Sequence, residues 1–197
     1  MEYNYKKKEI RINRSLNELD KFVIDFTNLL DEYVVVSGYV SILLGRTRAT
    51  EDVDLLIPKI DSYKFRKLWD KIHENEFDCL NTSDFEEAFN MLEEHAIRFA
   101  RKGIPLPNME FKIIKNELDK FSYDNKIKVI LNFNILYISP LELQIAYKLF
   151  LGSDKDIEDA RHIYRLLKEK INKQELLYSL EKLNVSKKFG LLENGEH

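Results

Sequence analysis

Residues 48–57 read RATEDVDLLI, and the stretch from Asp52 to Ile57 is an apolar strand pattern that stops at Pro58. Because successive side chains on a strand point to opposite faces, Asp52 and Asp54 are expected on one face and the apolar residues between them on the other. Two carboxylates in one small space repel each other unless a cation neutralises them, and such hard oxygen ligands suit Mg²⁺ or Mn²⁺. The spacing therefore favours a metal-binding strand. The alternative is an exposed strand end with two solvated acids.

A glycine turn precedes this strand in the sequence. The β-branched run 33–36 stops at Ser37-Gly38, and the apolar segment 39–44 is expected to form a short helix. A strand that leads through a glycine turn into a helix presents free backbone N–H groups and a favourable dipole to phosphate. Ser37 and Gly38 are therefore candidate nucleotide-binding residues, and an ordinary turn glycine is the alternative.

Three polar residues lie between the turn and the two aspartates. Arg46, Arg48 and Thr50 are candidate nucleotide-binding residues because a guanidinium group there can bind phosphate. The alternative partner of these arginines is the neighbouring carboxylate of Glu51.

Composition bounds the class of protein. The chain has 197 residues, which fits one domain, or one domain with a small helical appendage, around a sizeable core. Its 31 Lys and Arg against 34 Asp and Glu give a formal net charge of −3, so no overall field favours nucleic acid. The single cysteine, Cys79, indicates a reducing compartment. No apolar stretch is long enough to span a bilayer and the start of the chain is polar, so we expect a cytoplasmic protein.

Hydrophobic periodicity divides the chain into a mixed part and a helical part. Apolar residues at helical spacing predict a helix over 16–30, and period-two patterns predict strands within 96–138. From residue 139 onward the pattern is helical, with further helices beginning near residues 153 and 172. We therefore expect an α/β domain over 15–138 and a C-terminal helical region over 139–190. Capping boxes are expected at Ser15 with Glu18, Ser83 with Glu86, and Ser139 with Glu142.

The turn at Ser37-Gly38 together with residues 48–56 resembles the signature of the minimal nucleotidyltransferase superfamily, in which a Gly-Gly or Gly-Ser turn precedes an Asp-x-Asp strand. The resemblance implies a mixed sheet of the DNA polymerase β-like type, flanked by helices and joined to a C-terminal helical bundle. It also implies two Mg²⁺ ions and transfer of a nucleoside monophosphate from a triphosphate with loss of pyrophosphate. In that chemistry Asp52 and Asp54 are catalytic metal ligands.

A third carboxylate stands on a later strand in this superfamily, and the matching residue here is Glu110. Its side chain is expected to face opposite to the apolar Met109 and Phe111. The resemblance makes Glu110 a further catalytic residue and metal ligand. Because Lys112 lies on the same face, a simple ion pair between Glu110 and Lys112 is the alternative.

A second similarity lies downstream. Lys148 and residues 152–159, GSDKDIED, resemble the downstream lysine and the Lys-Asp-x-x-Asp motif of the abortive-infection toxin branch and related nucleotidyltransferases. This similarity implies nucleotide-binding roles for Lys148, Lys155 and Asp156, a tRNA or protein acceptor, and a partner antitoxin. For Asp156 and Asp159 the alternative is the favourable placement of acids in the first turn of a helix.

The sequence therefore predicts a metal-dependent nucleotidyltransferase that acts on a nucleoside triphosphate and an acceptor hydroxyl of tRNA, of a protein or of a small molecule. The alternative is a catalytically weak or inactive module of the same fold that binds nucleotide or neutralises a toxin. Three departures from the family pattern leave room for it: the Ser-Gly order, Glu110, and Ser153 where arginine is frequent. A purely structural interaction protein is a third reading.

Overall fold

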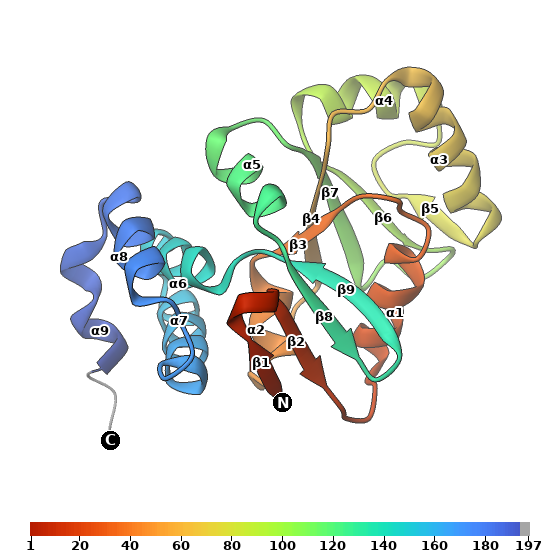
Figure 1. The fold of residues 1–197 in the computed structure, drawn as a ribbon. Coiled ribbons are helices and arrows are strands. Elements are labelled where there is room, and N and C mark those ends of the chain that lie inside the picture. The colour runs from red at the N-terminus through yellow and green to blue at the C-terminus, as the bar shows by residue number, and fades with distance from the viewer. Residues whose placement is uncertain (194–197) are drawn as a thin grey trace.

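A computed structural model describes residues 1–193, and within them the strands form one mixed sheet of nine strands (Figure 1). Its order is β1-β2-β8-β9-β3-β4-β7-β6-β5. The strands are β1 (Glu2–Asn4), β2 (Glu9–Ile12), β3 (Val34–Val36), β4 (Asp52–Ile57), β5 (Phe77–Cys79), β6 (Ile97–Arg101), β7 (Asn108–Ile113), β8 (Ile127–Leu131) and β9 (Asn134–Ile138). At its centre β4 pairs antiparallel with β3 and parallel with β7.

Some helices lie between the strands in the sequence and flank the sheet, and others follow its last strand. They are α1 (Glu18–Thr27), α2 (Gly38–Leu43), α3 (Ser62–Glu74), α4 (Phe85–Glu94), α5 (Glu117–Asp124), α6 (Leu141–Leu151), α7 (Asp154–Leu167), α8 (Lys173–Lys182) and α9 (Gly190–Glu193), with short 3-10 turns η1 (Tyr5–Lys7) and η2 (Ser186–Lys188). The mixed α/β architecture and the helical C-terminal part agree with the expectation from the sequence.

An aromatic core decides which face of the sheet stays open for a site. Phe111 of β7 and Phe99 of β6 both contact Phe26 of α1, with ring centroids 6.3 and 5.7 Å away. Phe99 also contacts Trp69 of α3 at 6.0 Å. Because α1 and α3 cover this apolar face, the alternate side chains of β4 and β7 emerge on the opposite face.

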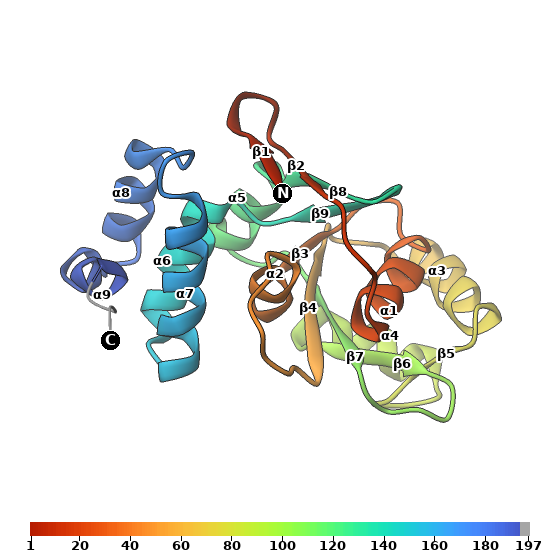
Figure 2. The ribbon, with the colours of Figure 1, turned by 90° about the horizontal axis from the view of Figure 1, so that it is seen from below.

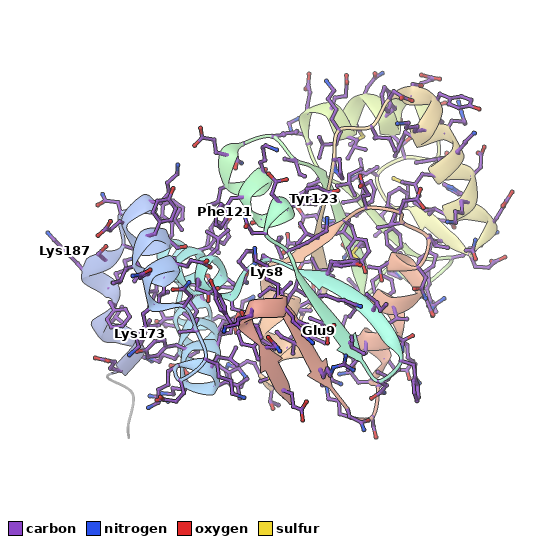
Figure 3. The ribbon with its side chains drawn as sticks, in the orientation of Figure 1. Lys8, Glu9, Phe121, Tyr123, Lys173 and Lys187 are labelled. Atoms are coloured by element: carbon purple, nitrogen blue, oxygen red, sulfur yellow. The ribbon has the colours of Figure 1, made fainter. Side chains whose placement is uncertain are left out.

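The C-terminal helices stand beside the sheet (Figure 2). α6 packs against α7 and α8, and α7 in turn packs against α2. α5 bridges the two parts: Figure 3 shows Phe121 on this helix, and Phe121, Leu143 and Tyr178 line a cavity of about 380 Å³ between α5, α6 and α8. The helices therefore form one wall of any site that begins at α2.

The N-terminal strands extend the sheet beyond the range expected from the sequence. β1 and β2 precede Ser15, and β2 pairs parallel with β8. The chain start is joined to the helical part as well, because the Tyr5 hydroxyl donates to Glu175 Oε1 at 2.6 Å and accepts from Asn172 Nδ2 at 2.6 Å. Strands of three or four residues are too short to show a clear alternation, so these were not foreseen.

Helix starts differ from the expected capping boxes at three places. Helix α1 is capped by Asn17 with Asp20, and α4 is capped by Asp84. At α6 the cap position is Pro140 without a side-chain hydrogen bond, because the Ser139 hydroxyl donates to Gln144 instead. Asp, Asn and Ser cap equally well, so neighbouring candidates compete for the position.

Two helix starts were predicted correctly. Ser153 caps α7 and Asn172 caps α8. No helix within residues 1–193 combines the length and apolar character needed to traverse a bilayer.

Candidate active site

Strands β4 and β7 bring two of the predicted carboxylates together. Their parallel register sets Asp54 opposite Glu110 and Asp52 opposite Asn108. The alternating burial of β4 leaves both aspartates half-buried on the face opposite to the fully buried Val53. Asp54 and Glu110 therefore share one small region of the open sheet face.

Lys112 lies between these two carboxylates. Its Nζ is 2.7 Å from Asp54 Oδ1 and 3.2 Å from Glu110 Oε1. Burial acts to lower the pKa of Lys112, but the charges and hydrogen bonds of Asp54 and Glu110 outweigh burial and hold that pKa above its ordinary value. Arg98 adds a second cation, with Nη2 3.7 Å from Glu110 Oε2. The ion pair between Glu110 and Lys112 is present, and it includes Asp54.

The carboxylate pair suits a divalent cation in charge and in donor type. Carboxylate oxygens are the hard donors that Mg²⁺ and Mn²⁺ prefer. Asp54 and Glu110 already converge on one cation, the ammonium of Lys112, and together they carry one negative charge more than it neutralises. In the part of the chain that the structure describes, no three His, Cys, Asp or Glu side chains are grouped to hold a metal ion.

Asp52 has a separate local partner. The Thr50 hydroxyl donates to the main-chain oxygen of Asp52 at 2.9 Å and lies 3.3 Å from its Oδ1. Thr50 therefore fixes the entry into β4 and the direction of the Asp52 side chain. Thr50 and Asp52, both predicted site residues, are therefore in contact at the start of β4.

A cleft of about 440 Å³ opens beside the carboxylate pair. Asp54 and Lys112 line its sheet side, Ser37 lines one end, and Tyr147 of α6 lines the helical side. Lys115, which follows β7, is a further wall residue with an exposed side chain. The structure thus joins Ser37 of the predicted phosphate turn and Asp54 of the predicted metal strand in one cavity. Its other lining residues include Val36, Leu56, His95, Asn116, Leu118, Asp119, Ser122, Ser139, Leu143, Gln144 and Leu151.

Gln144 of α6 holds the turn that ends β3. Its Nε2 donates to the Ser37 main-chain oxygen at 2.7 Å, and its Oε1 accepts from the Ser37 N–H at 3.3 Å. Ser37 itself has φ 62° and ψ −129°, an unusual conformation for a residue with a side chain. Sequence reasoning missed Gln144, which is buried on α6 together with two charged residues, Glu142 and Lys148.

Arg48 packs directly on Gly38. A Cβ atom at residue 38 would lie 2.4 Å from Arg48 Nη2, which is too close for a carbon atom and a nitrogen atom that are not bonded. Glycine is therefore required here so that the guanidinium can cover the first turn of α2. The six-residue helix α2 starts at this glycine, one residue before the start expected from the sequence.

Asp159 of α7 is the partner of that guanidinium. Its carboxylate accepts from Arg48 Nε at 3.1 Å and from Arg48 Nη2 at 3.0 Å, a bidentate pair. Arg46 Nε lies 3.8 Å from the same carboxylate. Both arginines therefore pair with Asp159, which lies far along the chain. The alternative partner considered from the sequence was Glu51, their neighbour in the chain.

Lys148 of α6 completes this buried cluster. Its Nζ lies 2.6 Å from Asp156 Oδ1 and 3.2 Å from Asp159 Oδ2, and only 2% of the lysine side chain is exposed. Burial acts to raise the pKa of Asp156, but hydrogen bonds from Lys148 and Ser153 outweigh it and hold that pKa below its ordinary value. We call Arg48, Lys148, Asp156 and Asp159 the Asp159 cluster. Lys155, the remaining candidate of this motif, has an exposed side chain.

The predicted site residues therefore form two groups that meet at the Ser37-Gly38 turn. Asp54, Glu110 and Lys112, which we call the cleft cluster, lie on the open sheet face. The Asp159 cluster lies between α2 and the C-terminal helices. Gln144 of α6 holds Ser37, and Arg48 of the loop between α2 and β4 covers Gly38, so each residue of the turn is fixed by a different partner.

Comparison with known proteins supports the fold. No family model matches the sequence, and no curated protein is similar to it in sequence. Among solved structures, the chain is similar to an antigenic nucleotidyltransferase-like protein from Paracoccidioides brasiliensis, with a TM-score of 0.53 and 17% identity. The similarity covers 87% of this chain and 88% of that one. The chain therefore has a nucleotidyltransferase-like fold, as the residues around Ser37-Gly38 and Asp52 predicted.

Proposed function

We propose that this chain is a metal-dependent nucleotidyltransferase that transfers a nucleoside monophosphate from a nucleoside triphosphate to an acceptor hydroxyl. The observation that carries the proposal is the convergence of Asp54 and Glu110 beside a cleft that begins at the Ser37 turn. The nucleotidyltransferase-like fold supports it. The acceptor belongs to the classes expected from the sequence: tRNA, a protein or a small molecule, with an antitoxin as partner if the chain acts as a toxin.

In this proposal Asp54 and Glu110 would hold Mg²⁺ or Mn²⁺, and Asp52 would contribute from the start of β4. The bound ions supply positive charge that activates the acceptor hydroxyl and stabilises the departing pyrophosphate. Ser37, which lines the cleft at the Ser37-Gly38 turn, would face the phosphates, and Lys115 on the wall of the cleft would add positive charge that attracts them.

The bond changes follow from the two substrates. The acceptor oxygen forms a bond to the α-phosphorus while the bond from that phosphorus to the oxygen that bridges to the β-phosphate breaks. Pyrophosphate leaves with the bonding electron pair, and a carboxylate oxygen of Glu110 accepts the hydroxyl proton. Arg48, Lys148 and Asp156 position the first turn of α2 through Asp159, while Arg46 and Lys155 lie at the edge of that cluster.

The test is pyrophosphate release in a cell lysate fraction that supplies acceptors, measured with each of the four nucleoside triphosphates and Mg²⁺. We expect one triphosphate to give release that depends on the wild-type chain and that falls by about a hundredfold or more in Asp54→Asn. Equal release by the wild type and Asp54→Asn would contradict the proposal.

A specific observation favours a second candidate function. Because Lys112 pairs with both Asp54 and Glu110, the two carboxylates have a cation of the protein beside them without any metal, as in a module that binds nucleotide or neutralises a toxin without catalysis. Such a module would bind triphosphate and release no pyrophosphate with any acceptor fraction, so the same assay separates the two functions.

A further inference from the structure

The place that a metal would take between Asp54 and Glu110 is occupied by a side chain of the protein itself. Lys112 contacts both carboxylates, at 2.7 and 3.2 Å. It comes from the same strand as Glu110, two positions further along β7, so the backbone register alone delivers it to this point. The contact is therefore built into the sheet.

A divalent ion and this ammonium exclude each other. A metal ion bound to both carboxylates would lie within contact distance of the ammonium at its present position, and like charges at that distance repel strongly in a partly buried site. The side chains of Asp54 and Glu110 are 19% and 16% exposed, so water screens this repulsion incompletely. Entry of the metal therefore requires Lys112 to move.

Lys112 has room to move. Its side chain is 34% exposed and it lines the cleft together with Lys115. A lysine carries its charge on a long flexible stem, so its ammonium can leave the carboxylates while the stem stays at the sheet. The free energy needed to break both ion pairs then opposes every binding of a metal ion.

We propose that Lys112 is an internal competitor of divalent metal for Asp54 and Glu110, which keeps the affinity of the carboxylate pair for free metal low. This inference rests on the proposed function, because it concerns the metal of that same site. In this proposal the positive charge of Lys112 regulates metal binding by the two carboxylates. Removal of the ammonium alone strengthens metal binding.

The experiment is a Mn²⁺ titration of the nucleotide-free, full-length chain followed by the electron paramagnetic resonance of free Mn²⁺. Lys112→Met keeps an unbranched side chain that is only one atom shorter and removes the charge. We expect this variant to bind Mn²⁺ more tightly than the wild type by on the order of tenfold, the size of a typical coupling between two binding events. Lys112→Arg keeps a cation at the site, so its Mn²⁺ affinity is expected to stay near that of the wild type.

Two controls test whether the gain in Mn²⁺ affinity comes from the contact of Lys112 with the carboxylates. Lys115→Met removes a neighbouring ammonium on the wall of the same cleft. It is expected to leave the Mn²⁺ affinity within a factor of two of the wild type, because water screens the charge of an exposed side chain. The double variant Asp54→Asn with Lys112→Met is expected to lose the gain. A melting temperature of Lys112→Met that rises with added Mn²⁺ would confirm that the variant folds and that its folded form binds the metal.

Equal Mn²⁺ affinity in the wild type and Lys112→Met would overturn the proposal, and so would an equal gain in Lys115→Met. Absence of Mn²⁺ binding in both proteins would also overturn it. Pyrophosphate release is measured separately: a gain of Mn²⁺ affinity in Lys112→Met without pyrophosphate release by the wild type would keep the competition and reject the proposed function.

Discussion

The Asp159 cluster and the cleft cluster both bring together acids and bases from different segments of the chain, but they differ in burial. Asp159 is fully buried and Lys148 is 2% exposed, so nearly every charge of that cluster has exchanged water for a protein partner. In the cleft cluster a third of the Lys112 side chain remains exposed. The first arrangement is suited to hold α2 against the C-terminal helices, and the second to exchange one cation for another.

The difference shows that a charged motif residue can act without touching a ligand. Lys148 and Asp156 belong to the motif that implied nucleotide binding, yet in the structure Lys148 binds Asp156 and Asp159. Their contacts reach the predicted phosphate turn only through Arg48 and Gly38. Substitutions in this cluster should therefore change stability first, whereas substitutions in the cleft cluster should change function first.

The largest expected effect on stability comes from Asp159→Asn. The change leaves Arg48 and Lys148 without their shared charged partner in a buried site, which costs about 3–5 kcal/mol of unfolding free energy. Urea denaturation followed by circular dichroism measures the loss. Glu158→Gln, at the exposed neighbouring position on α7, is the matched control and is expected to change stability by about 0.5 kcal/mol or less. A similar loss in both variants would show that the cluster does not hold the structure.

An intermediate effect is expected for Gly38→Ala. The added methyl group would meet Arg48 Nη2 at 2.4 Å, and the bidentate bond to Asp159 restrains that guanidinium, so overpacking should cost about 1–3 kcal/mol. The same change in an Arg48→Met background is expected to cost clearly less, because the clashing atoms are gone. Urea denaturation of the four proteins gives the coupling energy. Additive losses would mean that glycine is needed at residue 38 for another reason.

The smallest effect on stability is expected in the cleft cluster. Lys112→Met removes ion pairs that water partly screens, so the unfolding free energy should fall by about 1 kcal/mol or less. Thermal or urea denaturation in the presence of a chelator measures this change. A loss as large as that of Asp159→Asn would remove the contrast between the two clusters.

Local patterns explain why part of the site was predictable from the sequence. The strand that carries Asp52 and Asp54 matches its predicted bounds, because an apolar-rich run that alternates at its start and ends at a proline is a strong signal. The side of β7 that carries Glu110 and Lys112 followed from the same alternation. Both depend on backbone geometry within a single element.

Contacts between distant residues explain what was not predictable. Arg48 binds an acid that is 111 positions away, and Gln144 binds Ser37 across 107 positions. Such pairs depend on how α6 and α7 pack beside α2, and nothing within either segment encodes that geometry. The short strands β1 and β2 were not predicted because three or four residues show no clear alternation, and β2 joins the sheet by pairing with the distant strand β8.

Transfer of label from the triphosphate tests the central claim most directly, and it extends the pyrophosphate assay to the acceptor. The wild type, with Mg²⁺ and the lysate fraction, should attach the α-phosphate label to an acceptor and release the γ-phosphate label as pyrophosphate. Asp54→Asn should do neither at more than about a hundredth of that rate. Label from the γ-phosphate on the acceptor, or equal transfer by the wild type and Asp54→Asn, would contradict the assignment of this chain as a nucleotidyltransferase that acts through Asp54.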